Sequence, residues 1–240
     1  MDRPDSHSQR PPTTADEELL EAETTAIRTE LTDEQRLERI TDELRTGFEA
    51  LGHLGKAVSI FGSARTPRDH PRYAEARRMA RRLGEEGYAI ITGGGPGIME
   101  AANRGARDAG VPSVGLGIDL PHEQGLNPYV DLPLNFHYFF TRKVMFVRYA
   151  SGFVVFPGGF GTLDEMFEAA TLRQTGKIRF FPVVLMGSDF WGGMIDWLRS
   201  AVLGDEYVDE ADIGKLAICD DIEPALELLA DVVHRRPRAA

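Results

Sequence analysis

The sequence predicts an α/β fold: a Rossmann-like, doubly wound parallel sheet within a single domain. From residue 57 onward, short apolar runs alternate with longer stretches of helical spacing. Such runs contain few polar residues, as expected for strands that helices cover on both faces. Two glycine-rich loops each lie between an apolar run and a helical stretch, which is typical of the ligand-binding turns of these folds.

The expected elements begin with an N-terminal helix over residues 32–51. Thr32 followed by Gln35 matches a capping box, and Leu37, Phe48 and Leu51 belong to an apolar stripe at helical spacing. The predicted strands are 58–61, 88–92, 113–118, 153–156, 182–186 and 216–219. The predicted helices that alternate with them are 73–86, 99–109, 141–151, 163–174, 191–203 and 224–234.

Composition limits the class of protein. The chain has 240 residues, enough for one sizeable core, and a net charge of −11. That charge argues against nucleic acid as a partner, because binding it needs a basic face. No apolar run approaches the ~20 residues that span a bilayer, and no secretory signal is visible, so we expect a cytoplasmic protein with no membrane contact. Cys219 is the only cysteine, which excludes an internal disulfide.

The chain divides into a tail and one domain. Residues 1–30 are polar and rich in Pro, Thr, Asp and Glu. We expect a disordered tail there, with nascent helix around residues 19–27, because such composition cannot bury enough apolar surface to order the chain. Residues 31–240 are then a single nucleotide-binding domain with an extra helix at its N-terminus.

The two glycine-rich loops predict a phosphate site. Residues 92–100 read Thr-Gly-Gly-Gly-Pro-Gly-Ile-Met-Glu, and residues 157–165 read Pro-Gly-Gly-Phe-Gly-Thr-Leu-Asp-Glu. Glycine lets a ligand approach the main chain, and a helix start offers unpaired N–H groups and the positive end of its dipole. The alternative is that both are only tight turns. Neither has a Walker or dinucleotide-binding spacing. The candidate binding residues are Gly94, Gly95, Gly97, Gly158, Gly159, Phe160, Gly161 and Thr162.

Glu165 follows the second loop and has two interpretations. With Thr162 it matches a capping box, in which Glu165 only accepts the backbone N–H of Thr162. Alternatively it is a catalytic group, because a carboxylate that faces a phosphate loop is electrostatically unfavourable without a chemical role. We expect the buried face of this helix to consist of Leu163, Met166, Phe167 and Ala170. Glu165 would then point away from the core, toward the open edge of the sheet.

Arg142 and Lys143 open the preceding helix, where cations oppose the helix dipole. A solvated surface pair is one interpretation, and an anionic ligand nearby is the other. The aromatic segment 135–141 leads into this pair. It is either core packing or a wall on which a base stacks, and the sequence does not choose between them.

Three further residues are candidates near the loops. Ser63 either caps a turn or touches the ligand, and Glu100 either favours a helix start or binds the ligand. Glu123 follows the third predicted strand, where a carboxylate can bind ribose hydroxyls. His122 and His137 lack metal-ligand partners at useful spacing, so we expect neither a metal nor another cofactor.

Residues 157–165, with Arg142 and Lys143 upstream, resemble the Pro-Gly-Gly-x-Gly-Thr-x-x-Glu signature of the LONELY GUY (LOG) family. These are cytokinin riboside 5′-monophosphate phosphoribohydrolases, long mislabelled as lysine decarboxylases. The resemblance covers residues 57–187 and implies that Arg142 and Glu165 form the catalytic pair. It also implies substrate-binding roles for Lys143, Gly159, Phe160, Gly161, Thr162, Thr171 and Glu123.

The chain departs from the compact plant-type members of that family. After the first predicted strand it has Phe-Gly-Ser-Ala-Arg, where they have Cys-Gly-Ser-Ser, and both of its termini are extended. These features resemble the longer bacterial branch. They leave open the preferred base and the oligomeric state.

The resemblance implies hydrolysis of a nucleoside 5′-monophosphate, AMP or an N6-modified AMP, to a free base and ribose 5-phosphate. By analogy with glycoside hydrolysis, Glu165 would stabilise an oxocarbenium-like transition state and activate water, while Arg142 orients that carboxylate and the substrate. A non-catalytic nucleotide sensor of the same fold is the alternative, disfavoured by the presence of both residues. A DNA-handling module is disfavoured by the acidic charge.

Assembly is the last expectation, and the resemblance implies at least a homodimer. Apolar residues occupy more than one face of helix 141–151, and the next helix adds Met166 and Phe167. A sheet covers only one side of such a helix, so the other side would pair with a symmetry mate. The alternative is that the N-terminal helix 32–51 covers this surface within one chain. The apolar residues of helix 141–151 are Val144, Met145, Phe146, Val147 and Tyr149.

Overall fold

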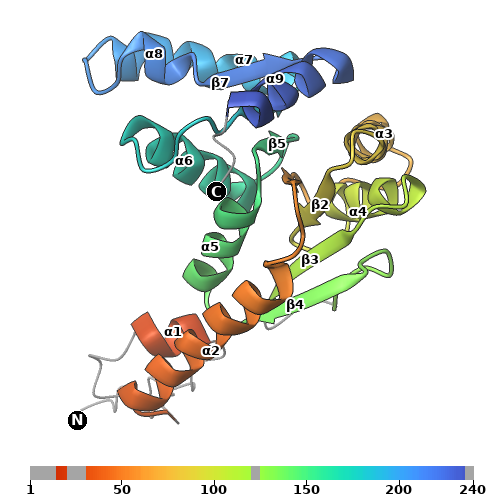
Figure 1. Cartoon of the computed structure of the whole chain (residues 1–240). Coiled ribbons are helices and arrows are strands. Elements are labelled where there is room, and N and C mark those ends of the chain that lie inside the picture. The colour runs from red at the N-terminus through yellow and green to blue at the C-terminus, as the bar shows by residue number, and fades with distance from the viewer. Residues whose placement is uncertain (1–14, 21–30, 120–124, 236–240) are drawn as a thin grey trace, which may run out of the picture.

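The computed structural model of the chain describes residues 15–20, 31–119 and 125–235 (Figure 1). Most of the expected tail therefore lies outside the described residues, as do His122 and Glu123. Residues Ala15–Leu20 form a short helix, α1. Within the described ranges no helix is both long and apolar enough to cross a membrane.

The predicted doubly wound parallel sheet is confirmed. In the described part of the chain seven strands pair in the order β4-β3-β2-β1-β5-β6-β7, and every pairing is parallel. The order reverses at β1, which pairs with β2 through Ser59↔Ile91 and with β5 through Ser59↔Phe153. The strands are β1 Ala57–Phe61, β2 Ala89–Thr92, β3 Ser113–Ile118, β4 Leu132–Phe136, β5 Phe153–Val155, β6 Val183–Met186 and β7 Leu216–Cys219.

Strand β4 is absent from the sequence prediction. It pairs only with β3, so it forms one edge of the sheet, and its residues alternate between half-buried and exposed before ending at the buried Phe136. Pro133 lies within it. An edge strand tolerates proline because one side of its backbone needs no partner. Neither the proline nor the partial exposure resembles the apolar runs that marked the inner strands.

The predicted helices are present with shifts of a few residues at their ends, and the short helix α8 is absent from the sequence prediction. The N-terminal capping box is confirmed: the Thr32 side chain accepts from Gln35 N, and Thr32 N donates to Gln35 Oε1 at 2.8 Å. A π-helical turn, Leu198–Leu203, extends α7. The helices after α1 are α2 Asp33–Leu51, α3 Pro71–Glu85, α4 Ile98–Asp108, α5 Phe139–Tyr149, α6 Phe160–Gln174, α7 Ser188–Trp197, α8 Glu210–Ile213 and α9 Ile222–Arg235.

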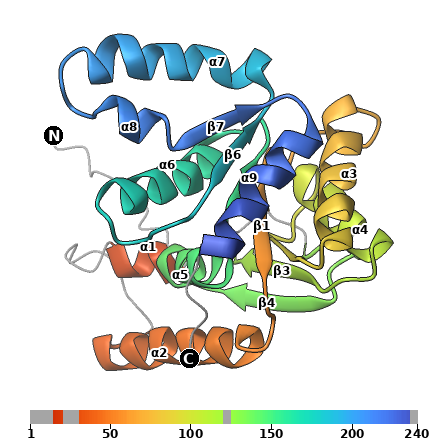
Figure 2. The same cartoon turned by 45° about the horizontal axis from the view of Figure 1, so that its top comes forward.

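The core lies in two layers, one on each face of the sheet. In β1, Val58 and Ile60 pack with α3, α4 and α9, whereas Ala57 and Phe61 pack with α5, α6 and α7. Figure 2 shows α3 and α4 on one side of β1 and α5 and α6 on the other. Period-two alternation in buried strands accounts for this division, since successive side chains point to opposite faces. The layers leave the carboxyl ends of the strands for the loops.

Helix α2 packs on α5, which is the arrangement that the sequence left as an alternative. An added Cβ at Gly47 would lie 2.6 Å from Met145 Sδ, so the two helices touch at this glycine. The Tyr149 hydroxyl donates to the Phe48 carbonyl at 3.3 Å, and the Arg148 guanidinium lies over the Phe48 ring. Part of the apolar surface of α5 is therefore covered within one chain.

The predicted apolar stripe of α2 is only partly buried. Leu51 is buried, but Leu37 is 63% exposed and Phe48 is 39% exposed. The buried face contains two charged residues instead, Arg36 and Glu43. Helical spacing alone placed the helix correctly but did not reveal that Glu43 faces inward, where it accepts hydrogen bonds from His137 N and the Thr141 hydroxyl.

Candidate active site

Three loops meet at the carboxyl ends of the strands, where the strand order reverses. Ser63, just after β1, donates its backbone N–H to the Pro157 carbonyl at 3.0 Å, at the start of the second glycine loop. The Ser63 carbonyl accepts from Ile98 N at 3.1 Å, at the end of the first glycine loop. Ser63 therefore ties both predicted loops together. This is the position at which open α/β sheets bind their ligands.

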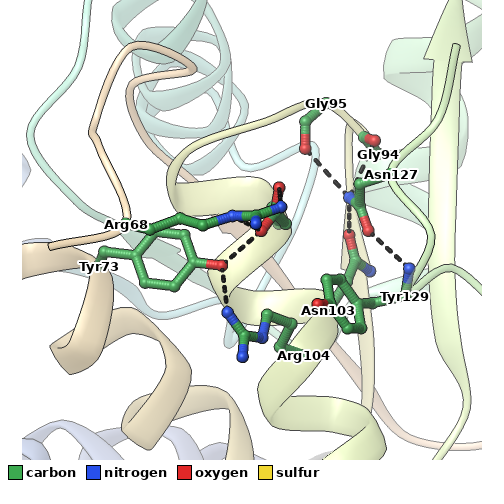
Figure 3. A network of polar contacts seen from close by, with 9 residues as sticks. Arg68, Tyr73, Gly94, Gly95, Asn103, Arg104, Asn127 and Tyr129 are labelled. Atoms are coloured by element: carbon green, nitrogen blue, oxygen red, sulfur yellow. Dashed lines mark hydrogen bonds and ion pairs between the residues drawn. The ribbon is translucent and has the colours of Figure 1, made fainter.

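The first glycine loop is held by a polar network that the sequence did not reveal (Figure 3). The Asn127 side chain donates to the carbonyls of Gly94 and Gly95 at 2.9 and 3.0 Å, and to Asn103 Oδ1 at 2.9 Å. Gly94 and Gly97 have φ of +74° and +66°, a region that favours glycine. An added Cβ at Gly97 would also overlap the Ser63 carbonyl. Backbone geometry thus explains these two glycines without a ligand.

The second glycine loop is different, because two of its glycines are not required by the fold. Among the residues that the structure describes, an added Cβ at Gly159 or Gly161 would meet nothing within 4 Å, and neither glycine has a positive φ. Gly159 precedes α6 and contributes no side-chain cap. The first turn of α6 therefore offers backbone N–H groups and the positive end of the dipole to an anion. Phe160, in that turn, is 92% exposed.

The two remaining candidates in this loop pack against each other. An added Cβ at Gly158 would lie 2.7 Å from Thr162 Cβ, so this position has no room for a side chain. Thr162 is buried within α6. Gly158 therefore lets the loop close onto the helix.

Glu165 is buried, which corrects the expected direction of its side chain. It is 3% exposed, whereas Phe167, expected in the core, is 38% exposed. The capping-box alternative is also wrong: α6 begins at Phe160, so Thr162 lies inside the helix, and the residue before the helix is Gly159. The buried face is Thr162, Glu165, Met166 and Ala169, while Leu163 and Ala170 are half-buried. The inward carboxylate lies near the positive charges of Arg142 and Lys143 on α5.

The environment of Glu165 gives it a pKa near neutrality. Burial raises the pKa of Glu165 from 4.5 to about 7. The positive charges of Lys143 and Arg142 oppose this rise, and the negative charges of Glu168 and Asp164 add to it. Glu165 Oε2 is buried and has no hydrogen-bond partner within the described part of the chain. A carboxyl group with such a pKa can exchange a proton at physiological pH, as a general base must.

Lys143 contacts three carboxylates of α6. Its Nζ lies 2.8 Å from Asp164 Oδ2, 2.7 Å from Glu168 Oε2 and 3.7 Å from Glu165 Oε2. Burial lowers the pKa of Lys143, but the hydrogen bonds to Asp164 and Glu168 outweigh it and hold the pKa above its usual value. The cations at the start of α5 thus face anions supplied by the protein itself. Asp164 and Glu168 were not among the candidates from the sequence, although their spacing around Glu165 on one helix is a visible signal.

Arg142 lies among aromatic rings beside Glu165. Its guanidinium lies over the faces of Phe139 and Phe146, 5.0 and 5.6 Å from the ring centroids. Its positive charge also opposes the rise that burial causes in the pKa of Glu165. The structure therefore brings the two residues of the implied catalytic pair together. Core packing is confirmed for Tyr138, which is buried, whereas Phe139 is 38% exposed, so a stacking role for Phe139 stays a prediction.

Two carboxylates from the N-terminal helices hold the start of α5. Glu43 Oε1 accepts from His137 N at 2.9 Å, and Glu43 Oε2 accepts from the Thr141 hydroxyl at 2.6 Å. The Asp16 carboxylate accepts from Phe139 N at 3.0 Å. Burial raises the pKa of Asp16. Neither residue was a sequence candidate, and the only signal for Glu43 was its position on the same face of α2 as Leu51.

The other predicted site residues have structural contacts of their own. Glu100 accepts from Arg68 Nε at 2.7 Å and from the Tyr73 hydroxyl at 2.6 Å (Figure 3). Burial raises the pKa of Glu100, but these bonds outweigh it and lower that pKa. The Thr171 hydroxyl donates to the Phe167 carbonyl within α6 at 2.8 Å. Glu123 lies outside the described residues.

Known proteins resemble this chain in sequence. Residues 99–229 match the model of a family described as possible lysine decarboxylase. The cytokinin riboside 5′-monophosphate phosphoribohydrolase of Mycobacterium tuberculosis is 30% identical over 169 residues, 67% of this chain and 88% of that protein. The pyrimidine/purine nucleotide 5′-monophosphate nucleosidase of Escherichia coli K12 is 32% identical over 125 residues, which are 48% of this chain and 28% of the nucleosidase.

Solved structures resemble it in fold. The molybdenum cofactor carrier protein of Chlamydomonas reinhardtii matches with a TM-score of 0.55 at 20% identity, over 75% of this chain and 98% of the carrier. The molybdenum cofactor binding protein of Rippkaea orientalis matches with a TM-score of 0.51 at 21% identity, over 74% of this chain and 96% of the other. At these identities the likeness concerns the fold alone.

Proposed function

The chain belongs to the LONELY GUY (LOG) family, the family described as possible lysine decarboxylase, and we propose from this membership that it hydrolyses the N-glycosidic bond of a nucleoside 5′-monophosphate. The products are a free base and ribose 5-phosphate. Relatives named as phosphoribohydrolases and as a nucleotide 5′-monophosphate nucleosidase support this reaction class. The observation that carries the proposal is the buried carboxylate of Glu165, which Arg142 and Lys143 compensate only in part.

The 5′-phosphate binds at the start of α6 in this proposal. Support comes from the open space at Gly159 and Gly161 and from the first turn of a helix without a side-chain cap. Backbone N–H groups and the helix dipole stabilise a phosphate there. Holding the phosphate fixes ribose C1′ relative to Glu165, so binding energy away from the reacting bond is used for orientation.

Glu165 is the general base in this proposal. The ionised carboxylate takes a proton from the water that attacks C1′, while the C1′–N bond breaks and its electron pair leaves with the base. Negative charge beside C1′ also stabilises the oxocarbenium-like transition state. Arg142 orients the carboxylate and donates a hydrogen bond to the substrate.

Incubation of the full chain with AMP and with N6-isopentenyl-AMP, followed by chromatography of the products, tests this function. We expect free adenine or free N6-isopentenyladenine together with ribose 5-phosphate, and the faster of the two reactions identifies the preferred base. Tight binding of both nucleotides without release of a base would instead identify a nucleotide sensor and refute the enzyme.

The same proposal includes a homodimer. On α5, Phe140 and Val144 are both 41% exposed, although α2 covers another face of the helix. Phe167 of α6 is 38% exposed. Apolar side chains on two helices form a surface that an isologous contact can bury. A cytoplasmic location stays a prediction from the sequence.

A further inference from the structure

The charges around Glu165 are arranged unequally. From α5 they are Arg142 and Lys143, and from α6 they are Asp164 and Glu168. The ammonium of Lys143 lies within hydrogen-bond distance of Asp164 and Glu168, at 2.8 and 2.7 Å, but 3.7 Å from Glu165. The lysine is therefore bonded to the two carboxylates that are not buried.

Burial makes this arrangement unexpected. The Glu165 side chain is 4% exposed, against 32% for Glu168 and 56% for Asp164. A buried carboxylate gains more from a direct ion pair than an exposed one, because water screens the exposed pair. Without the two outer carboxylates, the Lys143 ammonium would therefore lie closer to Glu165. The two outer carboxylates hold it back, and Glu165 Oε2 has no hydrogen bond to any residue that the structure describes.

We propose that Glu168 is a positioning residue that holds the Lys143 ammonium away from Glu165, so that Glu165 stays available to take a proton from water. Glu168 is the stronger of the two anchors because it is less exposed than Asp164, so water screens its contact with Lys143 less. It follows Glu165 by one helical turn, where side chains of a helix are neighbours. The catalytic role of Glu165 in this inference rests on the proposed function. The contact by which Glu168 positions Lys143 does not depend on that function.

The substitution Glu168→Gln tests this role. Glutamine keeps the shape and one acceptor oxygen but removes the negative charge, so Lys143 moves toward Glu165. The loss of the negative charge at position 168 and the approach of the ammonium both favour the ionised form of Glu165. We therefore expect the pKa of Glu165 to fall by about one unit. In the substrate-free protein this pKa is measured by carboxyl carbon NMR, with the Glu165 signal identified by its loss in Glu165→Gln.

The pH dependence of kcat/KM provides the second readout. Activity that requires ionised Glu165 rises with pH through the pKa of this group, so Glu168→Gln should move the rise to lower pH by the same amount. The matched control is Glu227→Gln, which removes the same charge from an exposed position on α9 and should leave the rise unchanged.

A double-variant cycle shows whether Lys143 carries the effect. Lys143→Met alone should raise the pKa of Glu165, since it removes a positive charge. In the Lys143→Met background, Glu168→Gln should lower this pKa by less than it does alone. Thermal unfolding of each variant reports whether the fold is intact.

The outcomes separate this inference from the proposed function. A Glu165 pKa that is unchanged or raised in Glu168→Gln would overturn the positioning role. If the wild-type chain releases no base from any nucleotide, the proposed function fails, and the NMR titration still decides whether Glu168 controls Glu165.

Discussion

Glu165 is a buried carboxylate whose Oε2 atom has no hydrogen-bond partner among the described residues, and the nearby Lys143 ammonium contacts Asp164 and Glu168 more closely. Such a group destabilises the fold when it is ionised, and it is correspondingly more basic. Stability given up at one residue in this way is typical of catalytic positions. The residue types of the site were predictable, because loop spacing and family resemblance name them. The inward direction of Glu165 was not, because the apolar residues of α6 predicted a buried face of Leu163, Met166, Phe167 and Ala170, whereas the packed helix buries Thr162, Glu165, Met166 and Ala169.

Replacing Glu165 by glutamine should remove most turnover while leaving the fold intact. The amide keeps the shape but cannot accept a proton, and loss of a general base typically costs about 10²- to 10⁴-fold in rate. Turnover of AMP and the thermal midpoint are measured on the same preparation. A variant that keeps its turnover and loses stability would instead show that Glu165 has only a structural role.

The same substitution should change how stability depends on pH. The pKa of Glu165 is raised on folding from 4.5 to about 7. The proton that it holds therefore contributes stability that is full below pH 4.5 and is lost as pH rises through 7. The wild type should lose on the order of 3 kcal/mol across this window, a loss that is absent in Glu165→Gln. Denaturant unfolding at pH 5 and pH 8 checks this, and parallel pH profiles of the two proteins would contradict it.

At the scale of elements, the start of α5 depends on helices that precede the sheet. Glu43 of α2 and Asp16 of α1 accept hydrogen bonds from residues 137–141, next to Arg142. The inner strands were predictable, because strands buried on both faces form continuous apolar runs. The edge strand β4 and the polar buried face of α2 were not. Pro133 concealed the strand, and the hydrogen bonds from His137 and Thr141 that compensate the burial of Glu43 come from distant positions in the sequence.

Glu43→Gln should weaken both the fold and the site. A glutamine has one acceptor oxygen and cannot accept from both His137 N and the Thr141 hydroxyl as the carboxylate does. We expect a loss of about 1–3 kcal/mol in the free energy of unfolding and a lower kcat. Asp42→Asn is the matched control, because Asp42 is exposed and pairs only with Arg45 among the described ion pairs. Equal effects of the two substitutions would rule out a specific role for Glu43.

For the whole molecule, the feature that bears on assembly is the partly exposed apolar surface of α5 and α6. Helix α2 packs on one face of α5, yet Val144 remains 41% exposed. We expect a homodimer of the 26.6 kDa chain at micromolar concentration, and Val144→Glu should shift it toward the monomer. Light scattering measures the mass. Leu228→Glu is the control, since Leu228 is 39% exposed, much like Val144, but lies on α9, which covers the other face of the sheet. A wild-type monomer with full activity would refute the dimer.

The comparison of AMP with adenosine decides whether the second glycine loop and Glu165 form one phosphoribohydrolase site. The two substrates share the base and the scissile bond and differ only in the 5′-phosphate that the start of α6 is proposed to hold. Loss of that anchor removes the orientation of C1′ against Glu165, so kcat/KM for AMP should exceed that for adenosine by at least about 10²-fold. Comparable values for the two substrates would contradict a site built on phosphate binding.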